Sequence, residues 1–437
     1  MGDQTSENQN QPQKSELESL YNLAHKAILE LETPYGINAS GKEDRFSAFF
    51  GRDSMITSLK LLRVYKRNRD KAFFRIITKC IETAVKLQGK RVNPLSGEET
   101  GKIIHEYRKS GYEHLVSHRN PWYLYPDKTL RNYDSIDSTP LFLILVGEFY
   151  KYTKDQEFLQ QILPSVGDAF FWINNYGHKR RDGLFLEYLL QRSDSYGGLV
   201  NQGWMDSPDS ILISGESPKE PIALVEVQGY YFKALKLWAS IYEKIDSEKS
   251  RDYQKKAQDL KKTFNELFLL KTEELNFFAQ AIFGSKALIL ERRSSPGHCL
   301  WASYEEGGKF ESIIDDKFIP DVVKRLMRPD LFLPGAGIRT LTTKSKFFNP
   351  LSYHNGSIWP FDNGLAAEGF NNFGFSNEAK KVRDAVLLAI KHFGTPVELY
   401  CANLDGALSE YKEEAGRHGT LVQAWTAATI LDFTTDY

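Results

Sequence analysis

The 437-residue sequence predicts an all-α fold in which an inner ring of helices is wrapped by an outer ring. Helical patterns recur along the chain, and several are separated by only a few residues, as antiparallel helix pairs are. Longer segments rich in glycine, aromatic and polar residues lie between the pairs, and this rhythm repeats about six times. Eight strong strands alternating with helices, which a β/α barrel requires, are not found. Long loops at one end of such a toroid would build a central pocket.

The N-terminal residues 1–14 are polar and are predicted to be a disordered tail. The first helix then begins with a capping box formed by Ser15 and Glu18, continues with leucine and alanine at helical spacing to Leu31, and ends before Pro34. No composition shift or flexible linker divides the rest of the chain. We therefore expect residues 15–437 to form one domain.

Ten further helical patterns follow in order, and the loops between them leave room for short strands. They lie at about 53–67, 71–88, 139–153, 155–175, 221–245, 250–268, 319–327, 360–373, 377–393 and 420–434. We expect Pro164 to break or kink its helix, because proline removes a backbone donor. Residues 277–290, with Gly284 in the middle, are typical of a β-hairpin.

The charge and composition of the chain exclude several functional classes. A formal net charge of −1 argues against a nucleic-acid protein, which needs a basic surplus. The basic runs at 63–75 and 249–262 lie in amphipathic helical sequence, which favours a solvated face. No apolar run reaches membrane-spanning length and no signal peptide is visible, so we expect a cytoplasmic location and no membrane partner. The three cysteines form no C-x-x-C pair, which gives no sign of a disulfide framework or thiolate metal site.

The segment 203–210 reads Gly-Trp-Met-Asp-Ser-Pro-Asp-Ser and sets a carboxylate, Asp206, next to Trp204. A flat aromatic surface beside an acid suits sugar chemistry, which needs a shelf for a pyranose face and a proton donor for the glycosidic oxygen. Taken alone, these residue types also suit an ordinary turn.

Arg52 and Asp53 stand at the entry to a helix, within Phe-Phe-Gly-Arg-Asp-Ser at 49–54. Asp53 or Ser54 can serve simply as the N-cap. An Arg–Asp pair at a loop-to-helix junction can also grip vicinal sugar hydroxyls, because arginine supplies a rigid fork of donors and aspartate accepts.

The densest polar and aromatic segment is 349–363, which contains His354, Asn355 and Trp359 around glycine and proline just before a helix. That composition is typical of a ligand-facing loop. Two carboxylates follow near the C-terminus. Glu410 lies in a charged run that reads as surface, whereas Glu398 lies between apolar neighbours.

Several of these motifs resemble the amylo-α-1,6-glucosidase domain of glycogen-debranching enzymes. They are F-G-R-D-S at 50–54 with its preceding phenylalanine, G-K-I-I-H-E at 101–106, G-W-M-D-S at 203–207, N-P-L-S-Y-H-N-G-S-I-W-P at 349–360 and Q-A-W at 423–425. The resemblance runs in order over nearly the whole chain from about residue 40. It implies an (α/α)6 barrel, a six-hairpin toroid with short β-hairpins in the inter-helix loops, as in glucoamylases and several inverting glycosidases.

The resemblance also implies a role for each site residue. Asp206 would be the general acid and Glu398 the general base, with Glu410 as the reserve candidate for the base. The other residues would bind substrate: Arg52 and Asp53 the hydroxyls of a terminal glucose, Trp204 and Trp359 the walls of the pocket, and His354 and Asn355 its rim.

The function implied is that of an inverting, exo-acting α-glycosidase acting on α-glucosidic bonds, chiefly α-1,6 branch bonds, of glycogen-like or gluco-oligosaccharide substrates. No metal or organic cofactor is expected. Relatives of this kind carry an N-terminal domain, so we expect that a separate chain can replace it. Three alternatives stay open: an inverting phosphorylase, a glycosidase for another small glycoside, and a non-catalytic glycan-binding protein on the same scaffold.

Overall fold

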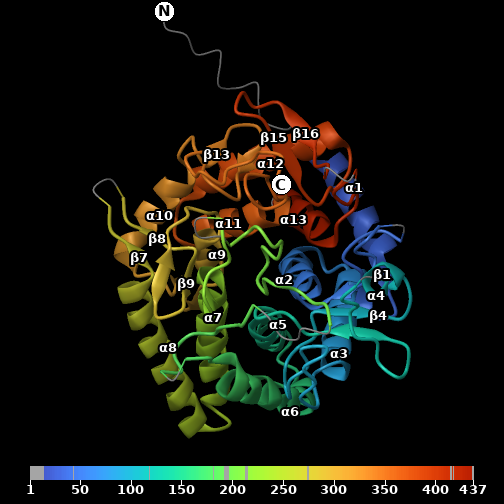
Figure 1. The fold of residues 1–437 in the computed structure, drawn as a ribbon, viewed down its shortest axis with the longest axis vertical. Helices are drawn as coiled ribbons and strands as arrows, with labels where there is room; N and C mark the ends of the chain where they lie inside the picture. The colour runs from blue at the N-terminus through green and yellow to red at the C-terminus, as the bar shows by residue number, and fades with distance from the viewer. Residues whose placement is uncertain are drawn as a thin grey trace, which may run out of the picture.

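The computed structural model describes residues 14–435 with gaps at 43, 118, 181, 191–195, 212–214, 273–274, 414–415 and 417. Within that part of the chain, six helices form a closed inner ring, in which each packs against the next and the last packs against the first (Figure 1). They are α2 (Gly51–Asn68), α5 (Ser138–Thr153), α7 (Val225–Tyr242), α9 (Pro296–Trp301), α11 (Pro360–Asn372) and α13 (Ala424–Thr434).

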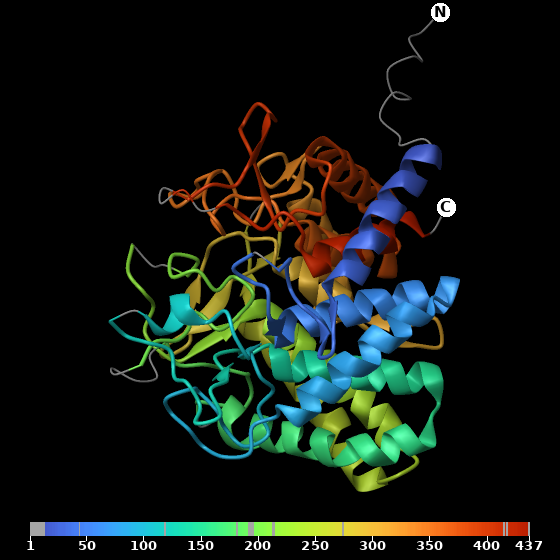
Figure 2. The ribbon, with the colours of Figure 1, turned by 90° about the vertical axis from the view of Figure 1, so that its right-hand side faces the viewer.

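An outer ring covers the inner one, with one outer helix packed on each inner helix. The outer helices are α1 (Lys14–Leu31), α3 (Lys71–Lys86), α6 (Gln156–Trp172), α8 (Ser247–Leu267), α10 (Ile319–Leu326) and α12 (Ser376–Phe393). The N-terminal α1 packs on the C-terminal α13, so the two ends of the chain close the toroid (Figure 2). The predicted (α/α)6 barrel is confirmed. Helix α1 begins at Lys14, inside the predicted tail, and the rest of that tail lies outside the described residues.

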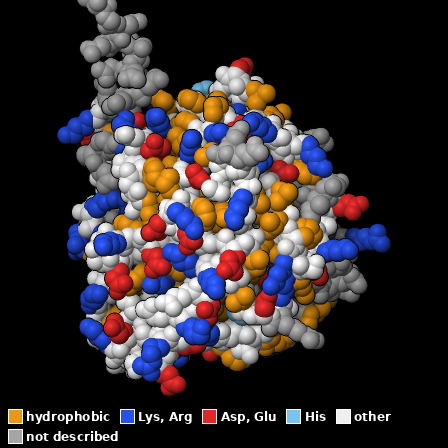
Figure 3. Space-filling model, turned by 90° about the vertical axis from the view of Figure 1, so that its left-hand side faces the viewer, with side chains coloured by type: hydrophobic (Ala, Val, Ile, Leu, Met, Phe, Trp, Pro, Cys, Tyr) orange, Lys and Arg blue, Asp and Glu red, His pale blue; other side chains and the backbone are white. Residues whose placement is uncertain are grey.

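The inner and outer helices differ in how much of their surface is buried, as their sequence patterns predict. Inner helices are buried around their whole circumference, as α5 is over 138–147. Outer helices bury one stripe only, which in α8 includes Tyr253, Ala257, Leu260 and Phe264. Figure 3 shows the wall around α8, where basic and acidic side chains are interspersed, as expected for the solvated face of the 249–262 run.

Short strands lie in the loops, and two of them lead directly into inner helices. One antiparallel sheet has the order β3 (Phe49–Phe50), β4 (Glu106–Arg108), β5 (Leu130–Asn132), and β3 runs directly into α2. A second has the order β10 (Ala287–Ile289), β9 (Ala281–Phe283), β6 (Ile222–Leu224), and β6 runs directly into α7. The remaining strands form hairpins: β1 (Glu32–Thr33) with β2 (Gly36–Ile37), β7 (Leu269–Leu270) with β8 (Phe277–Phe278), β11 (Tyr304–Glu306) with β12 (Lys309–Glu311), β13 (Phe332–Leu333) with β14 (Gly337–Ile338), and β15 (Tyr400–Ala402) with β16 (Leu408–Glu410).

The structure differs from the sequence-based expectation at three elements. Helix α6 continues through Pro164, which is on the exposed side, and ends in a π-turn at Ile173–Gly177. The helix expected from 221 begins at Val225, because 222–224 pair with β9. The predicted hairpin at 277–290 is shorter, since only β9 and β10 pair across Gly284 while β8 pairs with β7.

Helix α9, the shortest member of the inner ring, was not predicted from the sequence. Its six residues begin Pro-Gly, and a helix this short does not form alone. Close packing holds it instead. A Cβ on Gly229 of α7 would lie 3.1 Å from the Cα of Cys299, and one on Gly369 of α11 would lie 2.7 Å from the backbone nitrogen of Trp301. The two glycines let neighbouring backbones clamp α9 from both sides.

Two further short helices complete the elements, α4 (Glu113–Val116) and a 3-10 turn at Asp316–Phe318. No helix in the described part of the chain is both long and apolar enough to cross a bilayer.

Candidate active site

The first turns of the inner helices bring buried polar side chains to one end of the barrel. Helix N-termini leave backbone N–H groups unpaired and carry partial positive charge, so this end favours acidic groups. The side chains include Arg52 and Asp53 of α2, Asp137 before α5, Glu226 of α7, His298 of α9, Asp362 of α11 and Gln423 before α13. His298 Nε2 lies 2.7 Å from Asp362 Oδ1, and Gln423 Nε2 donates to Asp53 Oδ1 at 3.3 Å. The inner ring thereby builds a buried polar centre.

Arg52 links three parts of the chain at this centre. Its Nε donates to Asp137 Oδ2 at 2.6 Å, and its Nη1 donates to Asp206 Oδ2 at 3.1 Å. Its Nη2 also reaches the carbonyl of Gln202 at 3.4 Å. Only 3% of the arginine side chain is exposed, and its pair with Asp137, which is 1% exposed, is shielded from water. The planar guanidinium fixes the position of Asp206 relative to α2 and α5.

Asp206 is the more open of the two candidate catalytic carboxylates, with 27% of its side chain exposed. Burial raises the pKa of its carboxyl, and the charge of Asp137 acts in the same direction. The charge of Arg52 and its hydrogen bond oppose them, but the net shift is upward. An upward shift is what a general acid needs, because the proton must still be present when substrate binds.

Glu398 is nearly fully buried, just before β15. The Tyr353 hydroxyl donates to its Oε1, and the backbone N–H of Thr420 donates to its Oε2 at 2.9 Å. Burial raises the pKa of Glu398 to about 7, these two hydrogen bonds oppose the rise, and the charge of Asp206 adds to it. Glu398 therefore lies within the electrostatic reach of Asp206.

Glu410, the reserve candidate for the base, has a different environment. It lies on β16 with 52% of its side chain exposed, 3.8 Å from Lys412 Nζ and 3.7 Å from His418 Nδ1. It pairs across the hairpin with Tyr400, on the strand that follows Glu398. The structure thus places Glu398 inside the polar centre and leaves Glu410 in solvent.

Asp53 is buried beside both carboxylates. Burial raises its pKa to about 8; Arg52 opposes the rise, and the charges of Asp206 and Glu398 reinforce it. A carboxyl group with that pKa is largely protonated at neutral pH and can donate a hydrogen bond as well as accept one.

Aromatic rings line the region between the two carboxylates. The centroids of Trp204 and Trp359 lie 5.9 Å apart with their planes at 79°. His354 stacks on Trp359 at 5.1 Å and 11°, and Tyr353 packs edge-on against Trp359 at 4.9 Å. Both predicted tryptophans therefore belong to one aromatic wall.

His354 and Asn355, which we expected at the rim of the pocket, are both buried. His354 Nδ1 is 2.8 Å from Ser207 Oγ, and Asn355 Nδ2 donates to the carbonyl of Asp209 at 3.0 Å. Arg293 Nη2 donates to Asn355 Oδ1 at 2.7 Å. These bonds tie the 349–357 loop to the loop that carries Asp206. Buried polar side chains such as these form hydrogen bonds with other protein groups, because water is excluded.

The sequence motifs indicated no role for Asp137 or Glu226, which are acidic residues of this centre. Asp137 precedes α5 and reads as its N-cap, yet its carboxylate caps no helix and bonds Arg52 and Ser135. Glu226 sits in the first turn of α7, where acids are common. Burial raises its pKa to about 8, and the charges of Asp137 and Asp362 add to the rise while Arg52 opposes it. In both cases, an acidic residue at the start of a helix is so common that the sequence did not indicate a role in the site.

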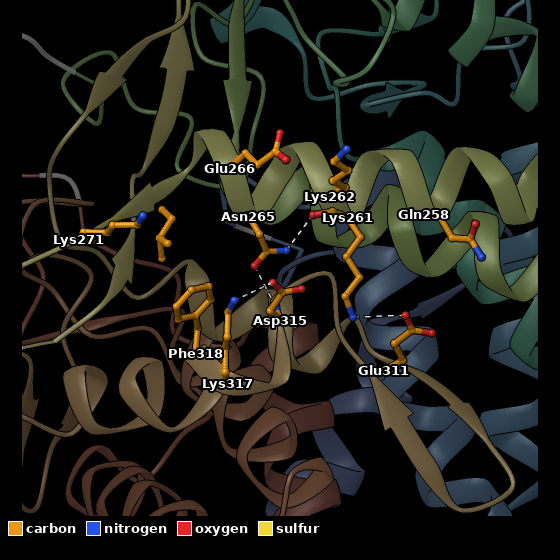
Figure 4. Close-up of a pocket in the computed structure, with 11 residues that line it drawn as sticks. Gln258, Lys261, Lys262, Asn265, Glu266, Lys271, Glu311, Asp315, Lys317 and Phe318 are labelled. Atoms are coloured by element: carbon orange, nitrogen blue, oxygen red, sulfur yellow. Dashed lines mark hydrogen bonds and ion pairs between the residues drawn. The ribbon is translucent and has the colours of Figure 1, made fainter.

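A hollow of about 610 Å³ lies on the outer wall between α8 and the segment 311–318 (Figure 4). Its polar lining is mixed, with Lys261 bonded to Glu311 and Asn265 bonded to the backbone of Asp315. It contains none of the buried acids described above. Among the described residues, no group of three or more His, Cys, Asp or Glu side chains is arranged to hold a metal ion.

The chain is similar to known proteins in sequence and in fold. A family model described as amylo-alpha-1,6-glucosidase matches residues 83–432. A comparison with curated protein sequences gives no match. GH63 mannosylglycerate hydrolase from Thermus thermophilus, in complex with Tris, is similar over 95% of this chain and 100% of its own, with a TM-score of 0.63 and 12% identity. The structure of the same enzyme in complex with glucose has a TM-score of 0.62 and 13% identity, over 95% of this chain and 100% of its own.

A rhamnosidase from Klebsiella oxytoca with rhamnose bound is also similar in fold. Its TM-score is 0.60 at 10% identity, over 97% of this chain and 64% of the rhamnosidase. These structures share the barrel, and the family model covers most of the sequence, including Asp206 and Glu398. The resemblance drawn from the motifs is confirmed: the chain belongs to the amylo-alpha-1,6-glucosidase family and is a glycoside hydrolase.

Proposed function

We propose that this glycoside hydrolase is an inverting, exo-acting α-glycosidase that releases glucose from α-glucosidic bonds, chiefly the α-1,6 branch bonds of glycogen-like or gluco-oligosaccharide substrates. One observation carries the proposal. Two carboxylates from distant segments, Asp206 and Glu398, share one buried centre; both have raised pKa values, and the charge of Asp206 contributes to the rise at Glu398. Inverting glycosidases use such a pair, one as acid and one as base.

In the proposed reaction, protonated Asp206 donates its proton to the glycosidic oxygen as the bond to the anomeric carbon breaks. Ionised Glu398 takes a proton from a water molecule that attacks the opposite face, which inverts the configuration. Arg52, 3.1 Å from Asp206, stabilises the carboxylate that remains after donation. Asp137 offsets part of the arginine charge, so that Arg52 does not hold Asp206 permanently ionised.

The other predicted site residues would bind the terminal sugar. Trp204 and Trp359, each only 2% exposed, would shape the apolar wall around the ring, and Arg52 and Asp53 would supply hydrogen bonds to its hydroxyls. Because the pKa of Asp53 is about 8, its carboxyl would donate to a sugar oxygen at neutral pH. His354 and Asn355 would act by holding the loop that carries Asp206.

The substrate panel must extend beyond α-1,6 bonds. The mannosylglycerate hydrolase, whose full length this chain covers, is named for a small glycoside. We would therefore measure sugar release from isomaltose, panose, maltose, a branched limit dextrin and mannosylglycerate, with and without phosphate. Glucose from the α-1,6 substrates supports the proposal. Release that requires phosphate would favour a phosphorylase, and release from mannosylglycerate alone would overturn the α-glucosidase assignment.

Tyr353→Phe should move the acid limb of the pH–rate profile to higher pH. The Tyr353 hydroxyl stabilises the charged form of Glu398, so its removal raises the pKa of the base and delays ionisation as pH increases. A hydrogen bond to a charged group is worth roughly 1.5–3 kcal/mol, which corresponds to a shift of about one pH unit or more. The measurement is kcat/KM against pH on isomaltose.

Tyr411→Phe is the matched control, because its ring centroid lies 5.2 Å from that of Tyr353 but the hydrogen bond to Glu398 comes from Tyr353. We expect its acid limb to stay near pH 7. Equal profiles for Tyr353→Phe and the wild type would show that Glu398 does not control this limb.

A further inference from the structure

A second hollow, of about 210 Å³, opens beside the candidate active site. It lies between the 92–102 loop, the end of α6 at Trp172 and the segment 187–189. Two aliphatic side chains stand at its mouth: Val92 is 57% exposed and Leu189 is 41% exposed. The volume falls below the roughly 300 Å³ at which sites for drug-sized ligands begin, so the hollow suits a single small ring.

One wall of this hollow is shared with the active site. Gln202 and Ile136 line it, and the Ile136 N–H donates to the Gln202 carbonyl at 3.0 Å. That same carbonyl lies 3.4 Å from Arg52 Nη2, and the residue after Ile136 is Asp137, the partner of Arg52. Gln202 therefore lines the hollow and also bonds Arg52 of the polar centre.

The floor of the hollow offers hydrogen-bond donors and acceptors side by side. Glu99 lies between two lysines, with Lys102 Nζ 3.7 Å from one oxygen and Lys179 Nζ 3.7 Å from the other. Trp172 Nε1 donates to Glu99 Oε2 at 2.7 Å, which fixes the carboxylate in place. Alternating donors and acceptors on fixed side chains suit a ring that bears several hydroxyl groups.

The remaining charges around the hollow cancel. Glu98 is paired with Arg91 at 3.5 Å, and Glu187 is paired with Arg180. Asp134 adds one further negative charge, which balances the surplus of the two lysines over Glu99. The lining itself carries four carboxylates and two lysines, and Arg91 and Arg180 behind it bring the formal charge to zero. This arrangement disfavours an anion such as phosphate, which would find no surplus of positive charge.

We propose that this hollow is a second saccharide site, which binds a distal sugar unit of an oligosaccharide whose reacting end occupies the polar centre. The proposal rests on the proposed glycosidase function and adds to it a preference for longer chains. The aliphatic mouth would pack against the apolar face of the sugar, and Glu99 with the two lysines would bond its hydroxyls.

The test is to fill the mouth with a large side chain. Val92→Trp should raise KM for isomaltopentaose or maltopentaose, whichever is cleaved, by roughly tenfold, equivalent to about 1.4 kcal/mol. The kcat/KM for the corresponding disaccharide should stay within twofold, because the short substrate does not reach the hollow. Lys179→Met should act in the same direction. Leu290→Trp is the control and should change neither constant, since Leu290 is 60% exposed directly after β10 and does not line the hollow.

Equal effects of Val92→Trp on the disaccharide and the pentasaccharide, or no effect on either, would overturn the second site. A binding measurement separates failure of the second site from failure of the glycosidase proposal. Isomaltopentaose and maltopentaose are each titrated by calorimetry into the Asp206→Asn protein, with and without Val92→Trp. Weaker binding caused by Val92→Trp, even if the wild type cleaves nothing, supports the site alone. Binding unaffected by Val92→Trp, or no binding at all, contradicts it.

Discussion

Asp206→Asn and Glu398→Gln are each expected to lower kcat on isomaltose by about 10²–10⁴-fold, the range of general acid and base catalysis. Both substitutions keep the shape of the side chain. Asparagine at 206 cannot supply the proton that the leaving oxygen needs, and glutamine at 398 cannot remove one from water. Steady-state kinetics, with circular dichroism to check folding, measures the effect.

A matched control comes from the hairpin that follows Glu398. Glu410→Gln changes a carboxylate that lies in solvent there. We expect this control to keep nearly full activity. A large loss in Glu410→Gln with activity retained in Glu398→Gln would assign the base to Glu410 instead.

Glucosyl fluoride separates the two roles. Fluoride leaves without needing a proton, so Asp206→Asn should recover much of its lost activity on this substrate, whereas Glu398→Gln should not. Recovery by Glu398→Gln alone would reverse the two assignments.

Lys60→Met should destabilise the fold by about 3–5 kcal/mol, the usual cost of removing one partner from a buried ion pair. Lys60 is only 1% exposed and holds three inner helices together. From α2, its Nζ donates to Glu368 Oε2 at 2.6 Å and to the Gly364 carbonyl at 3.1 Å on α11, and to Asp432 Oδ2 at 3.0 Å on α13. Without it, two carboxylates stay buried with less compensation. Chemical denaturation at pH 7 measures the loss.

Lys255→Met is the control, since Lys255 is 74% exposed in an ion pair with Asp259 on α8 and such pairs contribute little. The pH dependence gives a second check. Burial alone would raise the pKa of Asp432, but Lys60 and Arg63 lower it to about 2, below its ordinary 3.8. That stabilisation is present above pH 4 and is lost as pH falls toward 2. The wild type and Lys60→Met should therefore converge in acid, and a constant difference would contradict this account.

The barrel was predictable because helical periodicity and short connections are local properties of the sequence. Helix α9 was not, since its six residues depend on glycines 229 and 369, which belong to helices before and after it. Helix α6 also continues through Pro164, where we expected a break or a kink.

The candidate site was predictable only as separate motifs. Arg52 and Asp206 are 154 residues apart in the sequence, and Arg52 and Asp137 are 85 apart, so their joint geometry required the fold. The local pattern already favoured Glu398 over Glu410, but only the fold brings Glu398 close to Asp53. Asp137 and Glu226 look like common helix-start residues and become distinctive only through their buried neighbours.

The most direct test of the central claim is the configuration of the first glucose released. Proton NMR recorded during hydrolysis of isomaltose, before mutarotation, distinguishes the two anomers. Inversion by Asp206 and Glu398 predicts that β-glucose appears first and that the α-anomer grows only by mutarotation. α-Glucose as the first product would contradict the account, because it would require a retaining mechanism with a covalent intermediate.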